Sequence, residues 1–392
     1  MYVTVNAGSS SLKVAVFDES SLDSPQLSVA VEGIGTYDAN LIPNGEYGQA
    51  STQLVAASDH SAASSIIISW LKAQGVALED IKGIGHRVVH GGERYSGPVI
   101  IDDGVVAYLQ SIVPLAPNHT PVILACLKVF RDYFKNIAHV ACFDTAFFHD
   151  LPMAAQTIAV PEEVRHSGVR RYGFHGLSYE YILGDFASHE GHAAAGGRVI
   201  MAHLGSGASL SAVKNGQPID TTMGFTPASG IVMSTRTGDI DPGLIDYLIR
   251  EKNMTSADIS ELVYKQSGLL GISGKTSDMY TLIQSRHEDP LADLAVNVFC
   301  YTIKKTIGAY AAAMGGVDSL IFSAGIGERS AAIRKQITDG LEFLGIIVDD
   351  ERNERGDRLI SAEHSRVGVH VVPTHEDTII AVKTIQLCKE AL

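Results

Sequence analysis

The sequence predicts an α/β protein made of two related domains, and three observations support this prediction. A strand, turn and strand element occurs twice, at residues 3–17 and 199–213. The segments that follow each copy repeat the same order of helix and strand patterns. The chain has 392 residues, of which 45% are hydrophobic, so it is long enough for two substantial cores and too apolar to be disordered.

In both copies of the repeated element, a β-branched run ends in a turn of glycine and serine, and an alternating strand follows. Glycine and serine leave backbone N–H groups and small hydroxyls exposed where larger side chains would intrude. Turns of this kind can hold phosphate oxygens. Two such turns in one chain suggest two facing domains that each bind a different part of one nucleotide.

The other elements follow in order along the chain. The polar stretch 20–48 suggests further strands and loops at an antiparallel sheet edge, and a new unit is expected to begin between about residues 150 and 198. Helical periodicity, caps and apolar runs predict helices at 61–74, 120–134, 291–314 and 378–392, and strands at 81–92, 139–144 and 319–323, with a glycine turn at 325–328.

The composition excludes several classes of partner and location. A formal charge of −14 argues against binding to nucleic acid or to an anionic membrane, because both require a basic surface. The first residues lack the pattern of a signal peptide, and no apolar run reaches the length of a membrane span, so the cytoplasm is the expected location. The four cysteines are scattered through apolar runs, which predicts buried thiols.

Candidate polar residues in the first half lie at strand ends. Lys13 would place an ammonium group beside a phosphate held by the first turn, and Asn6 offers an oxygen ligand for Mg²⁺, although surface exposure and turn formation are the structural alternatives. Arg87 lies between glycines and suits a carboxylate or phosphate. Asp144 ends an apolar strand, where α/β proteins place ligand groups, or it caps a helix. His86 and His90 are on a strand, too far apart to share a metal.

The second half contains two cationic loops and two further motifs. Residues 170–176 combine Arg170, Arg171 and His175 between glycines, a composition that suits the charge on a transferring phosphoryl group, and Arg236 is the candidate cation of a second loop. The glycine turn at 325–328 would allow a planar or phosphate group to approach the backbone. Glu376 offers a carboxylate for Mg²⁺, with capping of the last helix as an equal alternative. Neither a P-loop nor a Rossmann fingerprint is supported.

Seven motifs, in order and nearly end to end, resemble the acetate kinase family; they lie at residues 6–13, 86–92, 143–147, 170–176, 223–227, 235–242 and 325–328. The resemblance implies an α/β fold of two duplicated ribonuclease H-like domains around a nucleotide cleft, as in actin, Hsp70 and sugar kinases. It implies an N-terminal domain of residues 1–148 plus 378–392 and a C-terminal nucleotide-binding domain of residues 149–377. It further implies ATP or ADP as co-substrate, Mg²⁺ or Mn²⁺, acetate or another short carboxylate as acceptor, and a homodimer.

The resemblance also implies a role for each matching residue. Asn6 and Glu376 would serve the metal, while Asp144, His175 and Arg236 would be catalytic. The acceptor would be bound by Arg87 and by pocket residues at positions Val89, Asn118, Phe174 and Pro227. The nucleotide would be bound by Lys13, His203, Leu204, Gly205, Ser206, Gly207, Asp278, Met279, Tyr280, Gly325, Ile326, Gly327, Glu328 and Arg329.

Two departures from the family pattern bear on function. Ser206 replaces the usual asparagine of the second phosphate turn, and a serine is shorter and lacks the donor pair of an amide. Asn118 replaces an apolar residue of the acyl pocket and could admit a more polar acid. A propionate, butyrate or other short-chain carboxylate kinase is therefore the alternative. A sugar kinase would need a base for a hydroxyl, and an actin- or chaperone-like nucleotide switch is a remote reading.

Overall fold

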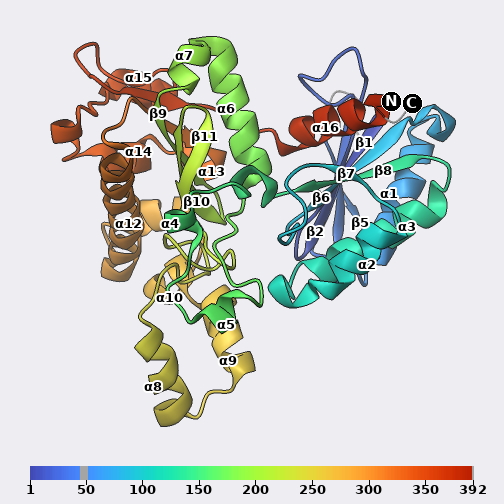
Figure 1. Ribbon diagram of the computed structural model, residues 1–392, viewed down its shortest axis with the longest axis horizontal. Coiled ribbons are helices and arrows are strands. Elements are labelled where there is room, and N and C mark those ends of the chain that lie inside the picture. The colour runs from blue at the N-terminus through green and yellow to red at the C-terminus, as the bar shows by residue number, and fades with distance from the viewer. Residues whose placement is uncertain (45–51, 391–392) are drawn as a thin grey trace. The chain divides into compact units, whose positions relative to one another are not determined.

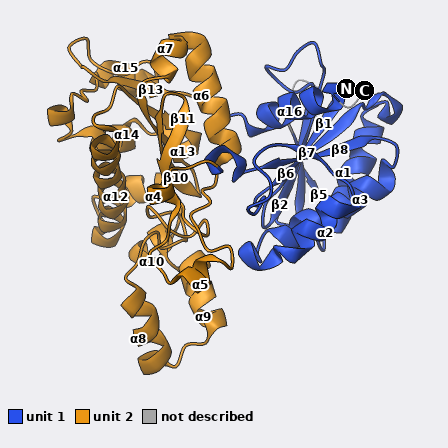
Figure 2. Ribbon diagram, in the orientation of Figure 1, with its two compact units in different colours: residues 1–149, 375–392 blue, residues 150–374 orange. Residues whose placement is uncertain are grey.

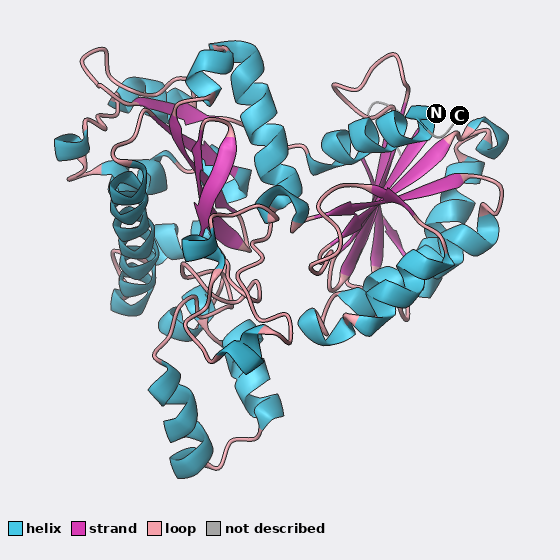
Figure 3. Cartoon of the chain, viewed as in Figure 1, coloured by secondary structure: helices cyan, strands magenta, loops and turns pink. Residues whose placement is uncertain are grey.

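A computed structural model describes residues 1–44 and 52–390, and the chain divides into two compact units (Figures 1 and 2). Unit 1 comprises residues 1–149 and 375–392, and unit 2 comprises residues 150–374. Each unit is a layered α/β body with its own sheet (Figure 3). Among the described residues, no helix combines the length and the apolar character needed to cross a bilayer.

The sheet of unit 1 has eight strands in the order β5-β4-β3-β2-β1-β6-β8-β7. The strands β1 to β5 form an antiparallel meander, β1, β6 and β8 run parallel, and β7 returns antiparallel at the edge. The strand bounds are β1 (Tyr2–Ala7), β2 (Ser11–Phe17), β3 (Leu27–Glu32), β4 (Asn40–Asn44), β5 (Gln53–Leu54), β6 (Gly83–Val88), β7 (Val99–Ile100) and β8 (Ala138–Phe143).

Three helices pack on this sheet, α1 (His60–Ala73), α3 (Thr120–Tyr133) and α16 (Glu376–Glu390), and α2 (Asp103–Ser111) packs on α3. The helix α16 packs directly on β6, where Gly83 and Gly85 leave room for it. A Cβ atom on Gly83 would lie 2.7 Å from Sγ of Cys388. His86 lies on the opposite face of β6 from Gly83 and Gly85, because successive residues of a strand point to alternate faces. Its ring contacts that of Phe130 on α3, so α16 and α3 cover opposite faces of the sheet.

The sheet of unit 2 has five strands in the order β11-β10-β9-β12-β13. They are β9 (Arg198–Leu204), β10 (Ala208–Lys214), β11 (Gln217–Thr221), β12 (Ser319–Ser323) and β13 (Gly368–Val371). The long helix α12 (Pro290–Met314) and the helix α6 (Gly176–Glu190) flank this sheet (Figure 1). The shorter helices are α4 (Met153–Gln156), α5 (Glu162–Arg165), α7 (His192–Ala195), α8 (Pro242–Lys252), α9 (Ser256–Glu261), α10 (Gly268–Ser273), α11 (Met279–Ser285), α13 (Ala324–Arg329), α14 (Ala331–Thr338) and α15 (Asp350–Arg355).

The two sheets share one five-strand pattern, which confirms the predicted duplication. In each unit, three antiparallel strands are followed by two strands parallel to the first: β3-β2-β1-β6-β8 in unit 1 and β11-β10-β9-β12-β13 in unit 2. In each unit, one helix that packs on the sheet comes after the last strand of the other unit in the sequence. The helix α6 comes after β8 but packs on β9 of unit 2, while α16 comes after β13 but packs on β1, β6 and β8 of unit 1.

Most expected helices and strands are present within a few residues of their predicted bounds, but the secondary structure of one segment was predicted wrongly. Residues 325–328 were expected to form a glycine turn, but they lie in the helix α13, because the chain bends already at Ala324, whose φ is 62°. Positions 45–48 of the stretch 20–48, and the last two residues of the predicted final helix, lie outside the described residues. The four cysteines are buried as thiols, as predicted.

Candidate functional site

The centre of the unit 1 site is a buried ion pair between Arg87 and Asp144. Arg87 is the penultimate residue of β6 and Asp144 follows β8, and the parallel pairing of these strands brings their carboxyl ends together. Nε and Nη2 of Arg87 both donate to Asp144 Oδ2, at 3.0 and 2.7 Å. Only 18% of the Arg87 side chain and 2% of the Asp144 side chain is exposed. Asp144 therefore fixes the plane of the guanidinium, which leaves Nη1 to face other groups.

Asn6 and Glu376 complete this cluster from β1 and from the start of α16. Arg87 Nη1 donates to Asn6 Oδ1 at 3.1 Å and lies 3.5 Å from Glu376 Oε2, and Asn6 Nδ2 donates to the same carboxylate oxygen at 3.2 Å. Burial disfavours the charged guanidinium, but Asp144 and Glu376 outweigh burial and raise the pKa of Arg87. Four residues from three strands and one helix thus form a single charged network.

Asp377 belongs to this neighbourhood, although the sequence reasoning did not select it. Its Oδ1 atom is buried without a hydrogen-bond partner among the described residues. Burial first, and then the negative charge of Glu376, raise the pKa of Asp377 to about 6, against the opposing effect of Lys13. In the sequence, Asp377 could have been noticed only because it is next to Glu376. Its burial in the structure is what distinguishes it from an ordinary acidic residue in the first turn of a helix.

The oxygen donors of unit 1 fit a magnesium ion that is shared with a ligand. Asn6, Glu376 and the unpartnered oxygen of Asp377 offer amide and carboxylate oxygens, which Mg²⁺ prefers. Within residues 1–44 and 52–390, however, no cluster of three or more His, Cys, Asp or Glu side chains is arranged to hold a metal by itself. Mg²⁺ usually retains water and phosphate ligands, so this donor set suits an ion brought in with a nucleotide.

The remaining predicted residues of unit 1 lie on different elements. Lys13 is exposed on β2, directly opposite Asn6 in the hairpin register. Val89 is buried after the end of β6, whereas Asn118 is exposed in the turn that precedes α3. His86 and His90 have separate partners, since His86 Nε2 bonds His139 Nδ1 at 2.9 Å, while His90 Nδ1 accepts from the Gly92 backbone N–H at 2.9 Å.

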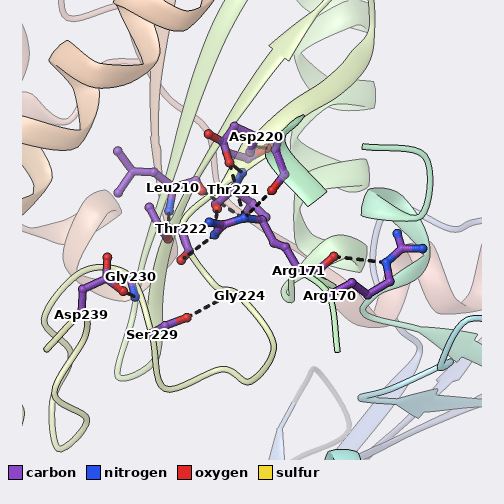
Figure 4. Close-up of polar contacts among 12 residues, drawn as sticks. Arg170, Arg171, Leu210, Asp220, Thr221, Thr222, Gly224, Ser229, Gly230 and Asp239 are labelled. Carbon is purple, nitrogen blue, oxygen red and sulfur yellow. Dashed lines mark hydrogen bonds and ion pairs between the residues drawn. The ribbon is translucent and has the colours of Figure 1, made fainter. Parts of the chain in front are cut away.

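In unit 2, the loop 170–176 is anchored by Arg171, which the sequence had suggested as a phosphoryl-binding cation (Figure 4). Nε of Arg171 donates to the carbonyl of Ala155 at 2.9 Å, and Nη1 donates to the carbonyl of Thr221 at 2.8 Å. An ion pair of 3.8 Å to Asp220 completes its contacts. We correct the earlier interpretation of this side chain: Arg171 holds the loop against β11.

His175 lies near the end of this loop as the N-cap residue of α6, where its φ of 61° turns the chain into the helix. Its ring stacks on that of His203, with ring centres 4.3 Å apart. A Cβ atom built on Gly207 would lie 3.3 Å from His175 Nε2 and 3.5 Å from Arg236 Nη1. An imidazole nitrogen and a guanidinium nitrogen therefore meet beside a glycine in the second Gly/Ser turn.

The loop that carries Arg236 is fixed to the same turn. The backbone N–H of Ser234 donates to the carbonyl of Ser206 at 3.1 Å, and Leu270 at the start of α10 donates to the carbonyl of Ser234 at 3.0 Å. Nη1 of Arg236 donates to the carbonyl of Pro227 at 3.0 Å. The predicted pocket residue Pro227 thus contacts the predicted catalytic arginine, and Phe174 is buried in the loop before His175.

A cavity of about 870 Å³ in unit 2 brings together most of the predicted nucleotide-binding residues. Its lining includes Gly205, Ser206, Asp278, Met279, Tyr280, Gly325, Ile326, Glu328 and Arg329. The other predicted positions of unit 2, which are His203, Leu204, Gly207 and Gly327, do not line it. The cavity is within the size range of small-molecule and cofactor sites.

Three residues at this cavity have structural contacts of their own. Asp278 caps α11, because its carboxylate accepts from the Thr281 backbone N–H at 2.8 Å. Glu328 accepts from the Thr374 N–H at 3.2 Å. Arg334, which sequence reasoning missed, is only 1% exposed and donates to the carbonyls of Gly327 and Glu328 at 2.9 and 2.8 Å. No motif signals Arg334, since its role depends on the tertiary position of the α13 carbonyls that it contacts.

The two sets of groups have complementary chemical abilities. The unit 1 network offers a buried cation and acidic oxygens, which suit a carboxylate and a hydrated metal. Unit 2 offers a glycine turn, an imidazole, a guanidinium and a cavity large enough for a nucleoside, which suit phosphate groups and their attached base.

Comparison with known proteins identifies the relatives of this chain. The model of the "Acetokinase family" matches residues 1–382. The acetate kinase of Bacillus subtilis (strain 168) is 40% identical over 393 residues, covering 99% of each chain, and that of Rhodopseudomonas palustris (strain TIE-1) is 40% identical over 385 residues, covering 97% of this chain and 96% of the relative.

Solved structures agree. The crystal structure of Porphyromonas gingivalis acetate kinase superposes with a TM-score of 0.90 at 37% identity, and that of a propionate kinase from Francisella tularensis subsp. tularensis SCHU S4 with a TM-score of 0.92 at 33% identity. Each alignment covers 98% of this chain and 99% of the other. The predicted resemblance and the two-domain α/β fold are thereby confirmed, and the chain belongs to the acetokinase family.

Proposed function

We propose that this protein is an acetate kinase, a phosphotransferase that uses ATP to convert acetate reversibly to acetyl phosphate. Relatives named acetate kinase that are 40% identical over nearly the whole chain support this activity. The observation that carries the mechanism is the meeting of His175 Nε2 and Arg236 Nη1 beside Gly207. Two nitrogens converge there at a turn whose backbone can approach a phosphate closely, as stabilisation of a transferring phosphoryl group requires.

In the proposed reaction, the acceptor carboxylate is already ionised at neutral pH, so no strong general base is needed. Arg87 binds this carboxylate through the donors that Asp144 leaves available, and Asp144 orients the guanidinium without removing a proton. His175 and Arg236 stabilise the charge on the equatorial phosphoryl oxygens during direct in-line transfer. Catalysis then depends on positioning and electrostatics.

The nucleotide is assigned to unit 2 and the metal to unit 1. The base and ribose would occupy the cavity lined by Ser206, Met279 and Ile326, and Lys13 with the turn 203–207 would contact phosphates. Asn6 and Glu376 would hold Mg²⁺ or Mn²⁺ together with water and phosphate oxygens. A metal held by these two residues would supply positive charge that offsets the negative charge of the phosphate groups.

The choice of acid is the point on which relatives differ, since one similar structure is that of a propionate kinase. The proposed acyl pocket consists of Val89, Asn118, Phe174 and Pro227, and Asn118 is the polar member. Acetate remains the proposed substrate because the curated relatives at 40 to 43% identity are named acetate kinase. A hydroxylated acid would gain a hydrogen bond from Asn118, whereas propionate or butyrate would lose apolar contact.

Trapping of the acyl phosphate with hydroxylamine tests this proposal. ATP and Mg²⁺ would be supplied with formate, acetate, propionate, butyrate or glycolate, and we expect the highest kcat/KM with acetate. A preference for glycolate that Asn118→Leu shifts to acetate would correct the acid and identify its cause. No hydroxamate with any of these acids would overturn the proposed activity.

We also propose that the protein forms a homodimer, as its resemblance to the family implies, and that it works in the cytoplasm. Sedimentation equilibrium of the full chain, whose mass is 41.8 kDa, tests the assembly, since a dimer has twice that mass. A sedimenting mass equal to that of one chain at micromolar concentration would contradict the dimer.

A further inference from the structure

We propose that a hydrogen-bond chain from Tyr179 through Ser209 fixes the tautomer of His175, with the ring proton on Nε2. Tyr179 and Ser209 are then positioning residues, because they act through the imidazole. The expected effect on turnover depends on the proposed function, whereas the tautomer itself does not.

The three side chains are brought together by one turn of α6 and one position of β10. His175 is the N-cap residue of α6, and the Tyr179 backbone N–H donates to the His175 carbonyl at 3.0 Å, so the first turn of the helix brings the two residues together. Tyr179 Oη lies 2.6 Å from Ser209 Oγ, and Ser209 Oγ lies 2.9 Å from His175 Nδ1. Tyr179 and Ser209 are fully buried, so the chain is built into the core of unit 2.

Geometry alone allows either hydroxyl of the Tyr179 and Ser209 pair to donate, and the proposed direction starts at the phenol because it is the more acidic of the two. Burial raises the pKa of Tyr179, so the phenol keeps its proton and can donate it to Ser209 Oγ. A serine hydroxyl that accepts from the phenol donates its own proton onward, and the acceptor within reach is His175 Nδ1. When Nδ1 of a neutral imidazole accepts a hydrogen bond, the ring proton is on Nε2.

This tautomer places an N–H donor at the Gly/Ser turn. His175 Nε2 lies 3.3 Å from the position of a Cβ on Gly207, the same position that Arg236 Nη1 approaches to 3.5 Å. A donor at this point can bond a phosphoryl oxygen, whereas an unprotonated nitrogen would repel it. The hydrogen bonds from Tyr179 and Ser209 thus make the His175 ring a hydrogen-bond donor at Nε2.

The neighbouring histidine has the same arrangement. His203 Nδ1 lies 2.8 Å from Ser178 Oγ, which in turn lies 2.7 Å from Thr374 Oγ1. The stacked rings of His203 and His175 therefore each have a hydroxyl at Nδ1. The site therefore contains two hydrogen-bond chains of the same kind, built from different residues, and a hydroxyl at Nδ1 is a general feature of its histidines.

Nitrogen-15 NMR of the full chain with labelled histidine measures the tautomer directly. The His175 signals, assigned by their loss in His175→Gln, should show an unprotonated Nδ1 and a protonated Nε2 at neutral pH. Ser209→Ala should change this pattern toward a mixture of tautomers, and Ser209→Thr should restore it because the hydroxyl is retained. A proton on Nδ1 in the unaltered protein, or a ring protonated on both nitrogens, would overturn the proposal.

Kinetics provide the second readout. We expect Ser209→Ala and Tyr179→Phe to lower kcat about ten- to hundredfold, the usual cost of losing a partner that orients a functional histidine, with a smaller change in KM for ATP. The matched controls are Ser211→Ala, on the same strand, and Tyr310→Phe, a buried tyrosine of α12, and both should leave kcat and the His175 signals unchanged.

The two readouts separate the proposals. If the protein makes no acyl phosphate but the His175 signals respond to Ser209→Ala as described, the proposed function fails and the tautomer assignment stands. If Ser209→Ala folds normally and leaves both the signals and kcat unaltered, the assignment is wrong and the proposed function is unaffected.

Discussion

The two units place different chemistry at corresponding positions of the same five-strand pattern. The strand registers align the first hairpin with the second and β6 with β12. The positions that correspond are Asn6 and His203, Lys13 and Ser209, Arg87 and Ser323, and Asp144 and Thr374. Unit 1 has three charged residues and an amide at these points, whereas unit 2 has a histidine and three hydroxyls.

One strand pattern thus supports two kinds of ligand recognition. The charged residues of unit 1 compensate one another within a buried network around Arg87, so the network is both a binding site and a part of the core. The hydroxyls of unit 2 leave space, and phosphate contacts there depend on backbone groups and on cations brought by loops. Substitutions in unit 1 should therefore lower both stability and activity, whereas substitutions in unit 2 should lower activity with a smaller effect on stability.

The largest expected effect comes from breaking the charged network. Arg87→Ala leaves Asp144 buried without its partner, so the free energy of unfolding should fall by about 3 to 5 kcal/mol and turnover by about a thousandfold or more. Urea unfolding and the hydroxamate assay measure the two effects. The double variant Arg87→Met, Asp144→Leu should recover most of the stability and none of the turnover. A stable and active Arg87→Ala protein would remove the distinction between the units.

Arg236→Ala is the corresponding test in unit 2. Its side chain donates one charge-assisted hydrogen bond to the carbonyl of Pro227, so the free energy of unfolding should fall by about 1.5 to 3 kcal/mol, less than for Arg87→Ala. Turnover should nevertheless fall by about a thousandfold, as for other arginines that stabilise a transferring phosphoryl group. Arg250→Ala, at an exposed position of α8, is the matched control and should change neither quantity. Near-normal turnover of Arg236→Ala would contradict the assignment.

A smaller effect concerns acid stability. His86 and His139 of unit 1 occupy the positions of Phe322 and Val369 in unit 2. Burial lowers the pKa of His139 to about 4, against the opposing effect of the Phe134 carbonyl, so the folded chain stays unprotonated there at pH values where the unfolded chain binds a proton.

The contribution of the unprotonated His139 to stability is complete above about pH 6.5 and is lost as the pH falls toward 4, by about 2 to 3 kcal/mol. The double variant His86→Phe, His139→Val, which carries the residues of unit 2, should lack this part of the acid sensitivity. Urea unfolding of both proteins at pH 7 and pH 4.5 gives the difference. Equal losses in both proteins would show that the pair is not its source.

The smallest predicted effect compares the two turns. Gly207→Ala adds a methyl group beside His175 Nε2, at a position whose φ is not in the left-handed region, so folding should be retained while kcat/KM for ATP falls about tenfold. In Gly8→Ala the methyl group meets the Ser11 hydroxyl at 2.7 Å, which can rotate away, so the loss should be smaller. An equal loss in both variants would argue that the turns have the same role.

Parts of the site could be read from local patterns. Asn6, Arg87 and Asp144 were selected because polar residues end apolar strands, and the structure brings them into direct contact. Arg171 was misjudged, because its carbonyl partners lie on segments distant in sequence and no local pattern identifies them. Asp377 and Arg334 were missed for a related reason, since burial and the path of α13 give these residues their character.

Apolar periodicity and short motifs are local properties of the chain, so the duplicated strand pattern, the glycine-rich turns and the family are evident from the amino-acid sequence. The contacts between side chains are evident only in the folded chain: Asp144 orients Arg87, Arg171 anchors a loop, and Ser209 lies against the ring of His175. Hydrogen bonds and ion pairs require distances of about 3 Å between residues that are far apart in sequence. Strand register and helix packing set those distances, and a linear pattern does not contain them.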